Sequence, residues 1–175
     1  MTSSGTLGTQ LFVGTRPQAK LLRPVANGTH FKPLGGIWTS PYLGAPPYSP
    51  WIEWCVEQSF GSGVYEMWLL EPRANVRVLS LDSDADIVHL EQLPGYELVP
   101  GRWNIDYEAL AQRYDGMRMS ASFIHRYRLD YRGRYDMVVY AWDVESTVWF
   151  RWVFNKPRAL GTATFEFESE WEASA

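Results

Sequence analysis

Aromatic side chains are the feature of this sequence that most limits how the chain can fold. The 175 residues include nine tryptophans, ten tyrosines and eight phenylalanines. So many aromatic side chains either build a dense core or line a pocket for a flat ligand. Hydrophobic residues make up 46% of the chain and charged residues 21%, so we expect a folded globular protein rather than a disordered one.

Length and charge narrow the class of protein further. The chain fits one domain, which we expect over residues 10–175 after a small, polar and flexible leader at 1–9. No apolar run approaches the ~18 residues that span a bilayer, and the first residues lack signal-peptide features, so a cytoplasmic location is expected. The net charge of −4 argues against wrapping nucleic acid by bulk electrostatics but leaves room for a local basic patch.

Apolar periodicity and turn residues predict about three helices and six or seven strands. The mixed order of these elements indicates an α+β domain with a mixed or antiparallel sheet, rather than a regular βαβ fold. Capping signals place the helices from Ser49 to Gly61, from Ser83 to Pro94, and from Asn104 to Gly116. Strands are expected at 11–15, 36–40, 64–70, 76–81, 137–142, 147–154 and 162–168.

Standard catalytic strings do not occur in this chain. There is no GxGxxG, GxxxxGK[ST], HExxH, GxSxG or CxxC, which argues against the commonest nucleotide, zinc-protease and serine-hydrolase signatures. Residues 82–86 imitate the start of a calcium loop, but Ile87 replaces the required turn glycine, so we interpret Ser83 and Asp86 as a helix cap. Cys55, the only cysteine, excludes an internal disulfide and is interpreted as an inert buried thiol.

One basic segment, residues 125–135, interleaves arginines with tyrosines. Arginine forks bind phosphates and tyrosine faces stack on bases, so this segment is a candidate for contact with nucleic acid or a nucleotide-bearing target. The alternative is a hairpin or strand edge with a solvated basic face. The arginines concerned are Arg126, Arg128, Arg132 and Arg134.

Several short stretches, taken together, carry a resemblance. They are KPLGGIWTS at 32–40 with WIEWC at 51–55, YDGM at 114–117, and WDVESTVW at 142–149. This pattern resembles a group of uncharacterised bacterial and phage proteins over roughly residues 32–149. More distantly, the order of the stretches resembles the ADP-ribosyltransferase fold. That resemblance implies two small packed sheets and NAD as the cofactor.

The same resemblance implies roles for particular residues. In that fold an early strand ends in an arginine or histidine, which points to Arg16 with Thr15 beside it. A second strand carries an aromatic-x-serine element, which points to Trp38, Thr39 and Ser40. A late acidic residue precedes a strand, which points to Glu145, with Asp143 as the alternative because the related uncharacterised group favours Asp143 and Ser146. Residues two apart on a strand share a face, so both carboxylates can project into one cleft.

The chemistry of NAD cleavage suits these residue types. Loss of nicotinamide passes through a sugar cation, which a nearby carboxylate such as Glu145 stabilises. Arg16 would bind the pyrophosphate or ribose, and Ser40 would orient the ribose. Trp38 or Tyr42 would offer an aromatic plane to the nicotinamide. The acceptor of ADP-ribose stays open between a protein, a nucleic acid and water.

Two other function classes are kept beside the transferase. One is a non-enzymatic binding module, with an aromatic platform for nucleic acid, nucleotide or sugar. The other is a structural or interaction protein, with a strand carrying Phe165 and Phe167 as an apolar face. The transferase hypothesis requires the implied residues to meet in one cleft, whereas the binding module requires exposed aromatics and no convergent carboxylate. Large aromatics such as Trp38, Trp51 and Trp142 can also serve as core alone.

Overall fold

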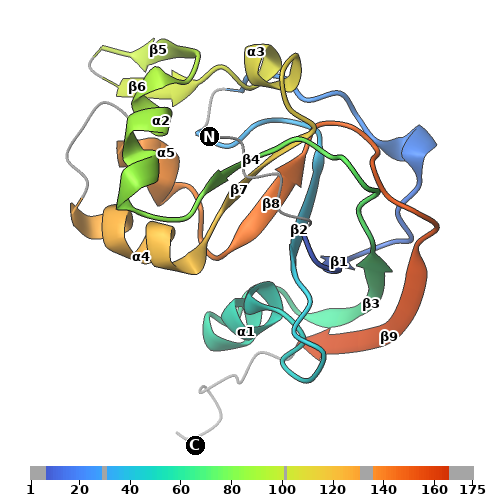
Figure 1. The fold of residues 1–175 in the computed structure, drawn as a ribbon. Coiled ribbons are helices and arrows are strands. Elements are labelled where there is room, and N and C mark those ends of the chain that lie inside the picture. The colour runs from blue at the N-terminus through green and yellow to red at the C-terminus, as the bar shows by residue number, and fades with distance from the viewer. Residues whose placement is uncertain (1–6, 29–30, 101, 131–135, 166–175) are drawn as a thin grey trace, which may run out of the picture.

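The structure is a computed structural model that describes residues 7–28, 31–100, 102–130 and 136–165. Strands and helices alternate in mixed order, which confirms the predicted α+β class (Figure 1). The strands are β1 Gln10–Val13, β2 Ile37–Pro41, β3 Gly63–Leu70, β4 Val78–Leu81, β5 Gly95–Val99, β6 Arg102–Ile105, β7 Gly116–Met119, β8 Ser146–Trp149 and β9 Arg158–Phe165. The helices are α1 Pro50–Glu57, α2 Ile87–Gln92, α3 Tyr107–Ala111, α4 Ala121–Asp130 and α5 Asp136–Tyr140, with short 3-10 turns η1 Ala19–Leu21 and η2 Asp84–Asp86. In the part of the chain that the structure describes, no helix has the length and apolar character needed to cross a membrane.

Seven strands form one mixed sheet and two form a separate ribbon. The sheet order is β4-β7-β8-β2-β1-β3-β9, and β5 pairs with β6. The β4–β7 pair is parallel, whereas the neighbouring pairs β7–β8, β2–β8, β1–β2, β1–β3 and β3–β9 are antiparallel. The first strand of the chain therefore lies inside the sheet, between partners that come later in the sequence.

The large sheet is split between β1 and β2. These two strands pair only at Gln10↔Pro41 and Leu11↔Ser40. Beyond that point β1 continues along β3, and β2 continues along β8. Figure 1 shows the two strands turning away from each other. The sheet thus consists of a β4-β7-β8-β2 half and a β1-β3-β9 half joined by a short seam.

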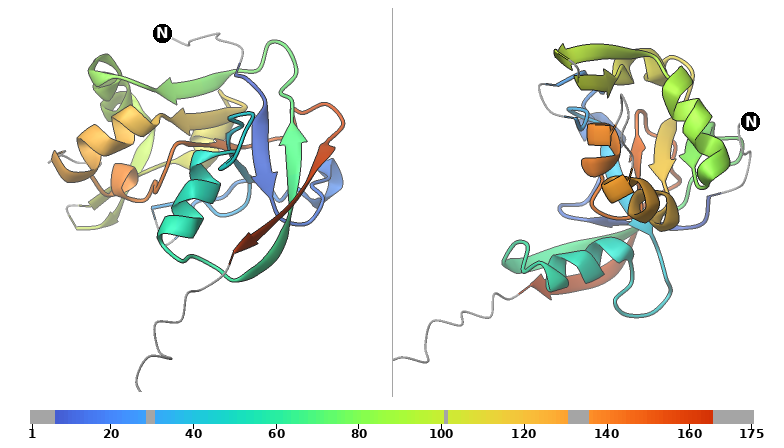
Figure 2. Two further views of the ribbon diagram at one scale, coloured as in Figure 1. Left: turned by 90° about the horizontal axis from the view of Figure 1, so that it is seen from below. Right: turned by 90° about the vertical axis from the view of Figure 1, so that its left-hand side faces the viewer.

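Each half of the sheet has its own helical cover. Figure 2 shows α1 lying against β3 and β9, while α4 and α5 lie on the other half of the molecule. Ile52 and Cys55 of α1 are buried with Met67 and Leu69 of β3. Phe123, Ile124, Val138, Val139 and Trp142 are buried in a second cluster that covers the β4-β7-β8 half.

A third cluster bridges the two halves. It brings together Ile37 of β2, Leu70 of β3 and Trp149 of β8. Phe154 is 1% exposed and packs edge-on against Trp149, with ring centroids 5.0 Å apart. Much of the aromatic supply is therefore used as core, as the composition suggested, because Trp142, Trp149, Tyr107, Phe123 and Phe154 are all fully buried.

The first predicted helix is confirmed in its cap and its first residue, but it ends at Glu57 rather than at Gly61. Ser49 is the N-cap of α1 and accepts a hydrogen bond from the Ile52 amide at 3.3 Å, and Pro50 is the first helical residue. The second helix begins as η2 and continues as α2. The third begins later than predicted, because Asp106 rather than Asn104 caps α3 and Asn104 is buried in β6.

The predicted strand at 137–142 is wrong, because residues 136–140 form helix α5. Its Val138 and Val139 are fully buried against α4, so tertiary packing overrides the β propensity of valine. The hairpin alternative for the basic segment is also wrong over residues 125–130, which belong to α4, while 131–135 lie outside the described residues. Strand β8 ends at Trp149 rather than at 154, and β9 begins at Arg158.

Candidate functional site

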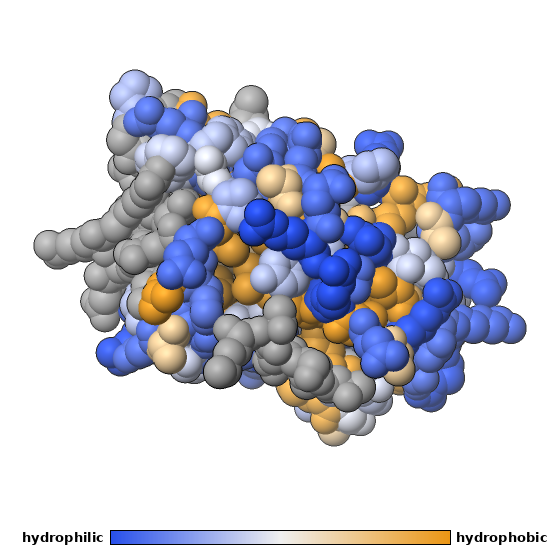
Figure 3. Space-filling model, turned by 45° about the horizontal axis from the view of Figure 1, so that its top comes forward, coloured by the Kyte–Doolittle hydropathy of each residue, from blue (hydrophilic) through white to orange (hydrophobic). Residues whose placement is uncertain are grey.

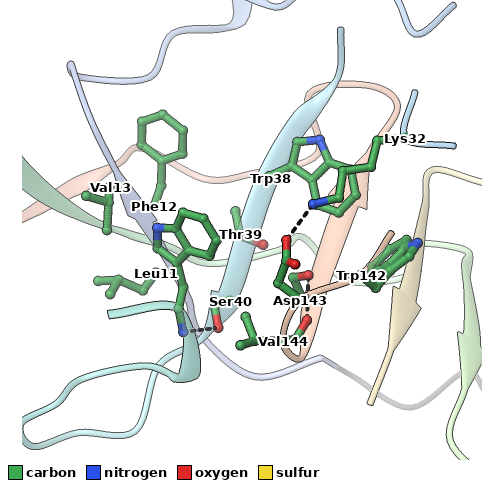
Figure 4. A pocket seen from close by; sticks show the side chains of 12 residues that line it. Leu11, Phe12, Val13, Lys32, Trp38, Thr39, Ser40, Trp142, Asp143 and Val144 are labelled. Carbon is green, nitrogen blue, oxygen red and sulfur yellow. Dashed lines mark hydrogen bonds and ion pairs between the residues drawn. The ribbon is translucent and has the colours of Figure 1, made fainter. Parts of the chain in front are cut away.

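A cavity of about 330 Å³ opens where β1 and β2 separate. Figure 4 shows side chains from both strands pointing toward it. The loop before β8, the start of α1 and Lys32, which precedes β2, complete its wall. The lining residues are Leu11, Phe12, Val13, Lys32, Trp38, Thr39, Ser40, Trp51, Trp142, Asp143, Val144 and Ser146.

A buried chain of hydrogen bonds fixes the seam beside this cavity. Trp149 Nε1 donates to Thr39 Oγ1 at 2.8 Å, and Thr39 Oγ1 donates to Gln10 Oε1 at 3.0 Å. Gln10 and Thr39 are 2% and 4% exposed. Buried polar groups are costly to leave unpaired, so these side-chain hydrogen bonds keep β1 and β2 together at the point where their backbone pairing ends.

Two tryptophans of the cavity wall are each held by a second tryptophan and remain partly exposed. Trp38 packs on the fully buried Trp142, with ring centroids 4.8 Å apart and an interplanar angle of 60°. Trp51 stacks on Trp54, with centroids 5.1 Å apart. Trp38 and Trp51 are half-buried, so each presents ring surface to the cavity from a rigid support.

Asp143 is the acidic residue that lines the cavity, and two cations hold it. Lys32 Nζ lies 2.7 Å from Asp143 Oδ2, and Arg128 Nη2 lies 3.5 Å from Oδ1. Lys32 Nζ also sits 5.7 Å from the centroid of the Trp38 ring. Figure 4 shows the Lys32–Asp143 pair beside Trp38. The wall of the cavity therefore carries a carboxylate that is paired with a lysine.

Glu145 lies on the same loop but faces away from this cavity. Its Oε1 is 2.6 Å from Arg118 Nη2, and its Oε2 accepts a hydrogen bond from the Ala121 amide at 3.2 Å. Arg118 also pairs with Asp82. Burial lowers the pKa of Arg118, but its hydrogen bonds and charge interactions with Glu145 and Asp82 raise that pKa more. Arg118 is thus a permanent cation that ties β7 to the loop before β8.

Ser40 connects the loop to the sheet. Its Oγ donates to the Glu145 carbonyl oxygen at 2.9 Å and accepts from the Trp51 amide at 3.4 Å. The hydroxyl is therefore engaged with backbone groups of two other segments. A second, more open hollow of about 450 Å³ lies on the far side of the loop, and Asp143 and Val144 line both spaces. Glu145, His125 and Arg128 line the second hollow.

The structure brings together some of the residues that the sequence singled out and separates others. Trp38, Thr39, Ser40 and Asp143 line one cavity, whereas Glu145, two residues further along the chain, lines the hollow on the other side of the loop. Arg16 lies elsewhere, with its Cζ 5.5 Å from the centroid of Trp68, in a different hollow from those residues.

Thr15 and Tyr42 also lie outside the cavity lining. Thr15 is an exposed residue beyond the end of β1. Tyr42 packs against the α1 cluster and donates to the Gly44 carbonyl at 3.3 Å. Of the residues that the resemblance implied, the β2 residues and Asp143 therefore line one cavity, whereas Glu145, Arg16, Thr15 and Tyr42 do not.

Sequence reasoning missed the cations of the site. Lys32 belongs to the KPLGG stretch, but nothing in the sequence pairs it with Asp143, which is 111 residues away. Arg118 follows the YDGM stretch directly and is the partner of Glu145. Phe12 and Val13 line the cavity because β1 leaves β2 there, and that divergence has no local sequence signal.

The basic segment is less available for phosphates than its sequence suggested. Arg126 Nε is 2.5 Å from Asp84, and Arg128 is held by Asp143 and lies over Tyr140, with its Cζ 5.4 Å from the ring centroid. Arg132 and Arg134 lie outside the described residues. The described part of this segment therefore makes internal ion pairs.

Several minor features have structural roles. Asp86 accepts hydrogen bonds from Asp82 N and from both N and Oγ of Ser83, which confirms the helix-cap interpretation. Cys55 is buried, and that burial raises the pKa of its thiol to about 11. Across the residues that the structure describes, no group of three or more histidine, cysteine or acidic residues is placed to hold a metal ion.

The predicted apolar face around Phe165 is covered. Phe165 is 7% exposed and packs against Tyr65, with ring centroids 5.3 Å apart, while Phe167 lies outside the described residues. On the face that Figure 3 shows, small hydrophobic areas are separated by hydrophilic side chains. A structural role through one continuous apolar face therefore gains no support from the described residues.

Comparison with known proteins found no relative of this chain. No protein-family model matches the chain, and neither curated proteins nor solved structures gave a match. The residue pattern and the geometry of the cavity are therefore the basis for a proposed function.

Proposed function

We propose that the protein is an ADP-ribosyltransferase-like enzyme that binds NAD with its nicotinamide and adjoining ribose in the β1–β2 cavity. The observation that supports this most is the convergence of Trp38, Ser40 and Asp143 on one cavity. An aromatic plane, a hydroxyl and a carboxylate are the three group types that nicotinamide–ribose cleavage uses.

The size and lining of the cavity suit the nicotinamide and its ribose. A volume of about 330 Å³ is at the lower end of ligand sites and suits a ring with its sugar rather than a whole dinucleotide. The nicotinamide ring of NAD carries a positive charge, which favours the face of Trp38. The hollow beyond the loop shares Asp143 and Val144 with the cavity and offers space for the rest of the dinucleotide, with Arg128 as its cation and Glu53, Glu57 and Glu145 as further carboxylates of its lining.

Asp143 takes the part of the carboxylate in this proposal. The bond between C1′ of the ribose and the nicotinamide nitrogen breaks, and its electron pair leaves with the nicotinamide. The positive charge that develops on the sugar is stabilised by Asp143. A nucleophile on the acceptor, or water, then forms the new bond at C1′ and releases its proton to solvent or a base. Lys32 must turn from Asp143 for this carboxylate to face the sugar.

One observation favours a second function, NAD or nucleotide binding without cleavage. Asp143 is paired with Lys32, and Glu145 is paired with Arg118. A carboxylate neutralised by a nearby cation stabilises a developing sugar cation less. If these pairs persist in the complex, the same cavity serves as a binding module.

The test measures nicotinamide release and ligand binding on the same variants. Purified protein is incubated with NAD, with and without cell lysate as a source of acceptors, while NAD binding is followed by tryptophan fluorescence. Asp143→Asn is expected to lower release by about 100-fold or more, because it removes charge stabilisation of the transition state. It should change NAD affinity only a few-fold. Glu71→Gln, an exposed carboxylate outside the cavity, is the matched control.

Each outcome separates the two functions. Release that is lost in Asp143→Asn and kept in Glu71→Gln supports the transferase. A fluorescence change that Trp38→Phe weakens and Trp68→Phe does not, without any release, supports the binding module. Absence of both release and fluorescence change would overturn both.

A further inference from the structure

A third hollow, distinct from the β1–β2 cavity and from the hollow at Glu145, is lined by positive and amide side chains together with apolar residues. It has a volume of about 610 Å³ and shares no lining residue with that cavity. Three cations, Arg16, Arg73 and Lys156, come to it from segments that are far apart in the sequence. The other lining residues are Pro17, Gln18, Ala19, Trp152, Phe154, Asn155 and Pro157, so no acidic side chain of the described residues lines the hollow.

The three cations have no acidic partner among the residues that the structure describes. Arg126, Arg128 and Arg118, by contrast, are all ion-paired. All three cations of the hollow are exposed, and the protein as a whole is negative, with a net charge of −4. Unpaired positive charge gathered in one hollow of an acidic protein is an electrostatic signal for an anionic partner.

The hollow is supported by hydrogen bonds of the backbone. The Arg73 amide donates to the Val153 carbonyl at 2.8 Å, and the Asn155 amide donates to the Glu71 carbonyl at 3.0 Å. Pro72 and Phe154 form a bridge between the same two segments. Arg73 and Lys156 are therefore presented from two segments that are clamped side by side.

Aromatic surface lies next to the positive charge. Trp152 is half-buried, lines the hollow and is held edge-on by Phe154, with centroids 5.4 Å apart. Arg16 lies over the ring of Trp68 at 5.5 Å, which orients its guanidinium. Gln18 and Asn155 add exposed amide donors. Cations that contact phosphates, beside aromatic rings on which bases stack, are the combination found at single-strand binding surfaces.

We propose that this hollow binds single-stranded nucleic acid through its phosphates, with Trp152 as the stacking surface. The proposal is independent of NAD chemistry, because none of its residues lines the β1–β2 cavity. The proposed contact with nucleic acid is made by Arg16, Arg73 and Lys156, rather than by the segment at 125–135 that the sequence indicated.

The test is fluorescence anisotropy with a labelled 20-nucleotide oligo-dT and the full chain, at salt concentrations from 50 to 200 mM. Three phosphate contacts give a slope of log K against log salt of about −2, which corresponds to roughly 20-fold weaker binding over that range. Each of Arg16→Ala, Arg73→Ala and Lys156→Ala is expected to reduce the slope by about 0.7. Arg113→Ala, an exposed arginine outside the hollow, is the matched control.

Competition with unlabelled polyanions tests whether the hollow prefers a single strand over duplex or heparin. An unlabelled single strand should displace the probe better than the same amount of duplex, because stacking on Trp152 needs unpaired bases. No binding of oligo-dT at 50 mM salt would overturn the proposal. Binding that is unchanged in a variant with all three substitutions, Arg16→Ala, Arg73→Ala and Lys156→Ala, would also overturn it. Equal displacement of the probe by heparin and by the single strand would do the same. Circular dichroism melting of each variant shows whether it is folded.

Discussion

At the residue scale, two buried threonines that face each other provide an internal comparison. Thr39 on β2 and Thr147 on β8 are register partners and are 4% and 0% exposed. Thr39 Oγ1 links Trp149 to Gln10, whereas Thr147 Oγ1 has no hydrogen-bond partner among the described residues. The two hydroxyls are both buried, and we expect them to affect stability differently.

We expect Thr39→Val to lower the free energy of unfolding by about 1–3 kcal/mol, because it leaves the Trp149 and Gln10 groups buried without a partner. Thr147→Val should leave stability unchanged or raise it, because it removes an unsatisfied polar atom. Urea denaturation of both variants gives the two values. Equal losses would contradict the hydrogen-bond chain as the feature that holds the seam.

Cys55 allows a prediction about pH. Burial raises the pKa of its thiol to about 11, above the ordinary value of 9.0. The neutral thiol is therefore favoured in the folded state, and this contribution to stability is complete below pH 9 and is lost as the pH rises toward 11.

We expect a maleimide or iodoacetamide reagent at pH 8 to label Cys55 slowly in the folded protein and about 10-fold faster or more in urea, since the thiolate is the reactive form. Mass spectrometry at timed intervals measures both rates. A Cys55→Ser variant should show no labelling in either condition. Rapid labelling of the folded chain would contradict the buried placement.

At the scale of elements, local capping chemistry could be predicted from the sequence, whereas tertiary contacts could not. The cap of α1 at Ser49 and the cap formed by Ser83 and Asp86 are confirmed, because each depends on residues at most three apart. The β propensity of Val138 and Val139 predicts a strand at 137–142, but burial against α4 places these residues in a helix.

The candidate site shows the same limit. Trp38, Ser40 and Asp143 could be selected from sequence stretches, and they do line one cavity. Lys32 and Arg118 could not be assigned as partners of Asp143 and Glu145, because ion pairs across the fold have no local signal. The resemblance to the ADP-ribosyltransferase fold predicted Arg16 in the same site, but the chain carries it to another hollow after β1 ends.

The Asp86 cap gives a prediction at this scale. Desolvation raises the pKa of Asp86, but hydrogen bonds from Asp82 and Ser83 and the charge of His89 lower it more, so the net shift is downward. The cap therefore stabilises the folded state above the ordinary aspartate pKa, and this contribution is lost as the pH falls through the depressed folded-state pKa.

We expect Asp86→Ala to cost about 1 kcal/mol at pH 7 and less at pH 3, where the wild-type carboxylate is also losing its charge. Thermal unfolding at the two pH values measures the difference. Glu53→Ala is the matched control, because Glu53 is an exposed acidic residue in the first turn of α1, whose cap is Ser49. A pH-independent loss for Asp86→Ala would contradict the role of its charge.

At the scale of the whole molecule, two half-sheets with separate helical covers are joined by a seam and by one bridging cluster. The seam has two register pairs, and the bridging cluster around Trp149 and Phe154 adds apolar contact between the halves. The cavity exists because the halves diverge, and its shape depends on how firmly they are held together.

We expect Phe154→Ala to lower the free energy of unfolding by about 3–5 kcal/mol and to separate the unfolding of the two halves. Phe165→Ala, within the α1 cluster of one half, should destabilise without that separation. Far-ultraviolet circular dichroism and tryptophan fluorescence, followed in urea, show whether the transitions coincide. Coincident transitions in Phe154→Ala would contradict the bridging role of this cluster.

The order of the strands also has a consequence for synthesis of the protein. Strand β1 precedes β8 and the loop that carries Asp143 by more than 100 residues, and residues of all three line the cavity. A chain growing on the ribosome therefore holds β1 without β8 until those residues have been made. A ligand of the cavity can stabilise the fold only after that later segment has emerged.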